Sequence, residues 1–77
     1  MEIKVLGPGC AKCKKTEEIV RAAVEETGIA ADVTKVSDMM EIAIHGVMGT
    51  PAVIIDDEVK VVGKVPTKEE VKGWLGG

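Results

Sequence analysis

The stretch GPGCAKCKK, residues 7–15, holds the two cysteines of the chain, Cys10 and Cys13, and separates segments of different period. Before it, EIKVL at residues 2–6 alternates charged and apolar residues, which is typical of a strand. After it, apolar residues recur at threes and fours, which predicts a helix over residues 10–27. The dithiol is therefore predicted at a junction from strand to helix.

Strand and helix patterns follow one another along the rest of the chain. The expected elements are a strand at residues 29–36, a short helix within residues 37–46, strands at residues 52–55 and 58–62 joined by a turn at Asp56-Asp57, and a final helix after Thr67. Within residues 37–46 a strand stays open, because Met40, Ile42 and Ile44 also alternate. The predicted fold class is α/β, in the order β-α-β-α-β-β-α, with one four-stranded mixed sheet flanked by helices.

Helix start and stop signals support this order. Asp38 with Glu41, and Thr67 with Glu70, have the spacing of a capping box. Gly28 follows the long apolar pattern as a C-terminal stop.

Length and charge limit the classes of partner. With 77 residues the chain can build one small core, so we expect a single domain over residues 1–77 and a monomer. Ten Lys and Arg are interspersed with thirteen Asp and Glu, which gives a net charge of −3 and no basic face for a nucleic acid. Without a secretion signal or a long apolar run, we expect a cytoplasmic location and no membrane partner.

The composition also favours a thermophilic source. The chain contains no Asn or Gln, the thermolabile amides, and 30% of its residues are charged. Its four methionines argue mildly against this interpretation.

The position of the cysteines suggests different roles for them. Cys10 falls at the start of the predicted helix, where unpaired N–H groups favour a negative charge. Lys12, Lys14 and Lys15 add positive potential, and thiols in such settings ionise below the free value of ~8.5. Cys13 follows one turn later, within reach of a mixed disulfide on Cys10. The spacing thus indicates an attacking Cys10 and a resolving Cys13.

Two other uses of the pair are weaker. A structural disulfide across two intervening residues would close too short a loop to stabilise the fold much. A metal site needs more ligands, because tetrahedral zinc takes four and His45 is the one further soft donor. We expect no bound metal within one chain.

The whole chain resembles the small archaeal and bacterial thioredoxin-like, glutaredoxin-like proteins. The resemblance rests on the dithiol after the first strand, on Thr50-Pro51 before a buried strand, and on the order of elements. It implies a cis bond before Pro51 and a substrate-binding segment at Gly49, Thr50 and Pro51. Met48 is expected to join this segment, as part of an apolar rim on which a partner protein could dock. An extended substrate would pair with the backbone of Thr50.

The sequence departs from typical members of that family at several positions. Ala11-Lys12 stands where thioredoxins have Gly-Pro, and Lys4 occupies the place of a buried aspartate that accepts a proton. The Gly-Gly-acid motif by which glutaredoxins hold glutathione is replaced by Gly63-Lys64. We therefore expect no cofactor, and a flavin-dependent reductase or another dithiol, in place of glutathione, as electron donor.

The resemblance implies a thiol–disulfide oxidoreductase that acts on protein disulfides. Cys10 attacks the substrate, Cys13 resolves the mixed disulfide, and Lys12 and Lys14 give electrostatic support. A redox-sensing regulatory module is an alternative that the sequence leaves open. A copper or zinc carrier similar to heavy-metal-associated domains is another, but its order β-α-β-β-α-β would require a helix across residues 52–62, against the turn at Asp56-Asp57.

Overall fold

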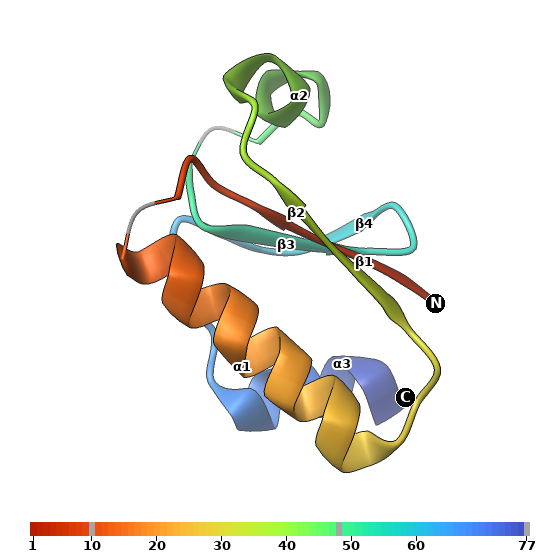
Figure 1. The fold of residues 1–77 in the computed structure, drawn as a ribbon. Helices are drawn as coiled ribbons and strands as arrows, with labels where there is room; N and C mark the ends of the chain where they lie inside the picture. The colour runs from red at the N-terminus through yellow and green to blue at the C-terminus, as the bar shows by residue number, and fades with distance from the viewer. Residues whose placement is uncertain (10, 48, 77) are drawn as a thin grey trace.

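Four strands form one sheet with the spatial order β2-β1-β3-β4 in the computed structural model, which describes residues 1–9, 11–47 and 49–76 (Figure 1). The elements are β1 (Glu2–Leu6), α1 (Ala11–Thr27), β2 (Asp32–Val36), α2 (Met39–Ile44), β3 (Ala52–Ile55), β4 (Glu58–Val62) and α3 (Lys68–Gly76). This is the predicted order of elements. β1 runs parallel to β2 and antiparallel to β3, which pairs antiparallel with β4, so the predicted mixed sheet is confirmed.

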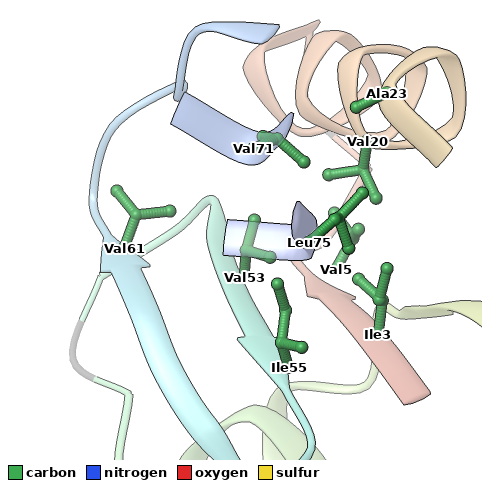
Figure 2. Packing of buried hydrophobic residues seen from close by; sticks show 9 residues of the cluster. All are labelled: Ile3, Val5, Val20, Ala23, Val53, Ile55, Val61, Val71 and Leu75. Atoms are coloured by element: carbon green, nitrogen blue, oxygen red, sulfur yellow. The ribbon is translucent and has the colours of Figure 1, made fainter. Parts of the chain in front are cut away.

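One face of the sheet is covered by α1 and α3, which lie side by side (Figure 1). The side chains between the sheet and these two helices point toward one another in Figure 2, and they come from β1, β3, β4, α1 and α3. The cluster consists of Ile3, Val5, Val20, Ala23, Val53, Ile55, Val61, Val71 and Leu75. Successive strand residues face opposite sides, so the odd-numbered residues of β1 and β3 build this core.

The opposite face carries a smaller cluster under α2. Leu6, Ala52 and Ile54, the even-numbered neighbours in β1 and β3, pack there with Ile42 and Val47. Ile44, on the outer side of α2, is 76% exposed. β3 is therefore buried along its whole length, whereas on this face β1 is buried only at Leu6.

The second strand is shorter than residues 29–36, as the sequence predicts it. It begins at Asp32 because the parallel ladder starts where β1 starts, with Glu2 opposite Asp32. Residues 29–31 have no β1 residue to pair with, although Ile29 and Ala31 still pack against the core. The alternating pattern of residues 29–31 therefore reflects the packing of Ile29 and Ala31 against the core, and not pairing with β1.

Residues 39–44 form a helix, which excludes the competing strand. The Asp38 side chain accepts a hydrogen bond from the Met40 N–H at 2.8 Å and caps the helix. At the other end the Gly46 N–H donates to the Ala43 carbonyl. With a hairpin across residues 52–62 and a helix at the end, the order differs from that of a heavy-metal-associated domain.

The turn of the β3–β4 hairpin is built from two aspartates in the left-handed region, with φ of 48° at Asp56 and 67° at Asp57. Two positive φ values in a two-residue loop are the pattern of a type I′ turn, which prefers glycine at the second position. We expect Asp57→Gly to stabilise the protein by about 0.5–1 kcal/mol, because glycine removes the left-handed penalty at the expense of some backbone entropy. Thermal unfolding checks this; Asp57→Ala, which keeps the penalty, should show no gain, and a lower melting temperature for Asp57→Gly would contradict it.

The last helix begins with the predicted capping box. The Thr67 N–H donates to the Glu70 carboxylate at 3.0 Å, and the Glu70 N–H donates to the Thr67 hydroxyl at 3.1 Å. The Thr67 backbone N–H holds the pKa of Glu70 below its ordinary value. These reciprocal bonds satisfy two backbone N–H groups at the start of α3.

Glu26 of α1 bridges two lysines of α3. Its carboxylate oxygens lie 2.5 Å from Lys68 Nζ and 3.1 Å from Lys72 Nζ, and hydrogen bonding to these lysines lowers the pKa of Glu26 below its ordinary value of 4.5. A carboxyl with a lowered folded-state pKa contributes stability above 4.5, and this stability is lost as the pH falls through the lowered value.

We therefore expect Glu26→Gln to melt at a slightly lower temperature than the unsubstituted protein at pH 7. The difference should shrink as the pH falls below 4.5 and vanish below the lowered pKa of Glu26. It should also shrink in high salt, because the pairs are exposed to solvent. Melting curves between pH 7 and about pH 3 measure it. Glu25→Gln, at an exposed neighbouring position, is the control; a gap that stays constant with pH would contradict the ion-pair explanation.

Candidate functional site

Cys13 lies in the first turn of α1 and is buried, with 1% of its surface exposed. The predicted attacking residue, Cys10, lies outside the described residues. One turn beyond Cys13, Thr16 is buried as well, and its hydroxyl donates to the Lys12 carbonyl at 2.9 Å. The predicted resolving thiol is therefore shielded from solvent at the start of the helix.

The register of the sheet places Thr50 and Pro51 at the end of the sheet where β1 leads toward α1. β3 begins at Ala52, which pairs with Leu6 at the end of β1. Carrying this antiparallel register one residue further places Pro51 opposite Gly7. The two segments are more than 40 positions apart in the chain, yet they meet where β1 leads toward α1.

Backbone hydrogen bonds hold both of these segments to the outer strands. The Gly7 N–H donates to the carbonyl of Val36, the last residue of β2, at 2.8 Å. On the other side, the Gly63 N–H donates to the Pro51 carbonyl at 2.9 Å. These hydrogen bonds link residues at or next to the ends of all four strands, so the backbone at this end of the sheet is held in place from both sides.

The segment before β3 has the cis geometry that the family resemblance implies. The Thr50–Pro51 peptide bond is cis, and Pro51 is fully buried. Gly49 and Thr50 are half-buried. Met48, also predicted to bind substrate, lies outside the described residues.

The charged residues near the start of α1 are mostly basic. The first turn of α1, described from Ala11 onward, contains no acidic residue, and Lys12 and Lys14 are exposed. Lys4, in the place of the aspartate of typical thioredoxins, pairs with Glu2 at 3.4 Å. No carboxylate therefore replaces that aspartate at position 4 itself.

Metal-binding and membrane-spanning features are not found in the described part of the chain. Across residues 1–9, 11–47 and 49–76, no group of three or more His, Cys, Asp or Glu side chains could hold a metal ion. Within the same ranges, the helices are too short or too polar to cross a membrane.

The backbone N–H of His45 caps the end of α2 by donating to the Glu41 carbonyl at 3.2 Å.

Comparison with known proteins decides the family. A family model described as the thioredoxin domain matches residues 1–76. A thioredoxin of Methanocaldococcus jannaschii is 49% identical, over 97% of this chain and 91% of the relative. A thioredoxin of Methanothermobacter thermautotrophicus is 40% identical, over 97% of each chain. The chain belongs to the thioredoxin family.

Membership of the thioredoxin family gives the reaction class. The chain is a thiol–disulfide oxidoreductase, as the position of the dithiol predicts. Both thioredoxin relatives come from archaeal thermophiles, in keeping with a composition poor in amides. The metal-carrier alternative finds no support in these relatives.

Sequence reasoning missed one residue of this thioredoxin-family site. In the sequence Gly7 is only the first residue of the stretch that separates the strand pattern from the helix pattern, yet in the structure it is buried and lies against the Cys13 side chain. The sequence does place a glycine between the predicted strand and the helix that carries the dithiol. That position alone does not reveal which side chain occupies the room the glycine leaves.

Proposed function

We propose that residues 1–77 form one domain that reduces protein disulfides through Cys10 and Cys13, with Cys10 as nucleophile and Cys13 as resolving thiol. The observation that carries the assignment of roles is the burial of Cys13 in the first turn of α1. A thiol shielded from solvent is not accessible to a protein substrate, but it can still attack a neighbouring sulfur of the same chain. Cys10, three residues earlier in the sequence, takes the intermolecular step.

The reaction proceeds by two exchanges. The Cys10 thiolate attacks one sulfur of the substrate disulfide, breaks that S–S bond, forms a mixed disulfide and releases the first substrate thiolate. The Cys13 thiol gives up its proton to a water molecule or another base, and its thiolate then attacks Cys10 Sγ and expels the second substrate thiolate. Both substrate thiolates take up protons. Two electrons pass to the substrate, and the Cys10–Cys13 disulfide is the oxidised product.

Substrate binding is assigned to the segment of Met48, Gly49, Thr50 and Pro51. Two features support this: Thr50 and Pro51 immediately precede β3, at the end of the sheet where α1 begins, and Gly49 and Thr50 are partly exposed. An extended substrate segment can hydrogen bond to the Thr50 backbone there.

The other partners follow from the same chemistry. Lys12 and Lys14, exposed near the start of α1, favour the thiolate form of Cys10 by their positive charge.

A flavin-dependent reductase or another dithiol returns the oxidised protein to its reduced form, in the cytoplasm, where thiols are kept reduced. The protein acts as a monomer.

A turnover assay tests this function. The reduced protein is incubated with an oxidised protein substrate and a dithiol donor, and the appearance of substrate thiols is followed. We expect Cys10→Ser to reduce the rate to that of the donor alone. A Cys10→Ser variant with full activity would refute the assigned role of Cys10, and an unsubstituted protein without turnover would refute the reductase function.

A further inference from the structure

Gly7 leaves the room that the Cys13 side chain occupies. A Cβ atom at Gly7 would lie 2.8 Å from Cys13 Cβ and would overlap Cys13 Sγ still more closely. Carbon atoms that are not bonded keep about 3.5–4.0 Å apart. Any residue other than glycine must therefore displace the buried thiol or the first turn of α1.

The backbone of Gly7 has little freedom to give way. Its N–H is bonded to the Val36 carbonyl, and the preceding Leu6 pairs with both β2 and β3. Gly7 is not among the residues with positive φ, so its backbone would accept alanine. The requirement for glycine comes from the contact with Cys13.

We propose that Gly7 is a positioning residue for the resolving thiol. Because Gly7 has no side chain, Cys13 Sγ can lie close to the end of β1. This inference rests on the proposed function. A sulfur attacking a disulfide must approach in line and at close range, and a displacement of about 1 Å can slow such a step about 100-fold. Gly7 acts through its contact with Cys13 and takes no chemical part in either exchange.

The proposal predicts which exchange changes. Attack by Cys10 breaks the substrate S–S bond and does not involve Cys13. Resolution forms the Cys10–Cys13 bond, breaks the bond between Cys10 and substrate, and sends the electron pair to the leaving substrate sulfur. A side chain at position 7 should slow the second exchange and leave the first unchanged.

Single-turnover kinetics with Gly7→Ala test this prediction. We expect resolution about 10–100-fold slower, with accumulation of the mixed disulfide, while the rate of Cys10 alkylation, measured in a Cys13→Ala background, stays within about 2-fold. Gly73→Ala is the matched control, because nothing lies within 4 Å of a Cβ there. Resolution of Gly7→Ala at the rate of Gly73→Ala would overturn the proposal.

A stability cycle keeps the proposal testable if Gly7→Ala folds poorly. Cys13→Gly removes both of the atoms that a Gly7 Cβ would meet most closely. We expect Gly7→Ala to lower the melting temperature with Cys13 present and to change it little in the Cys13→Gly background. Equal losses in both backgrounds would overturn the contact. Because this cycle involves no turnover, it also separates failure of the inference from failure of the proposed function.

Discussion

Cys13→Ser is expected to stop the reaction half-way, with substrate covalently bound to Cys10. The hydroxyl that replaces the buried Cys13 thiol cannot attack a disulfide, so the first exchange proceeds and the second does not. Turnover should fall to the background rate. The mixed disulfide should persist for as long as external thiol is excluded.

Non-reducing electrophoresis and mass spectrometry detect this complex. The variant is mixed with an oxidised protein, and we expect one covalent adduct that dissociates when a small dithiol is added. Cys10→Ser is the matched control and should form no such adduct. If the two variants behave in reverse, with the adduct on Cys13, the assigned roles of the cysteines are wrong.

Ile3→Ala is expected to cause the largest loss of stability among these substitutions. Ile3 is fully buried in the central strand β1, between α1, α3 and the neighbouring strands. Truncating a buried isoleucine to alanine costs about 2–5 kcal/mol. In a domain of this size each kcal/mol lowers the melting temperature by about 4–8 °C.

Ile44→Ala is the matched control for this substitution. Ile44 is 76% exposed on α2, so the same change of side chain should alter stability by no more than about 0.5 kcal/mol. Urea and thermal unfolding of both variants measure the difference. Similar losses for Ile3→Ala and Ile44→Ala would contradict the burial that separates them.

The strands and the turn between them are predictable because local signals bound them sharply. Residues 2–6 end at Gly7-Pro8-Gly9, and residues 52–55 and 58–62 flank two aspartates in a tight turn. The start of β2 is not predictable in this way. Its first residue is set by where β1 begins, which is a property of the pairing and not of the alternating pattern.

The site is predictable in its chemistry and less so in its packing. The place of the dithiol and of Thr50-Pro51 along the chain follows from motifs, and the position of Pro51 opposite Gly7 follows once β3 is known to run antiparallel to β1. The contact between Gly7 and Cys13 depends on how closely α1 approaches the end of β1. No spacing in the sequence encodes that distance.

The shielding of Cys13 also affects how the protein meets peroxides and other small oxidants. Oxidation of a cysteine to sulfenic and higher acids follows its accessibility, and 1% exposure leaves this sulfur almost unreachable from solution. Damage of that kind is thus kept from Cys13, the thiol to which the proposed function assigns the second exchange.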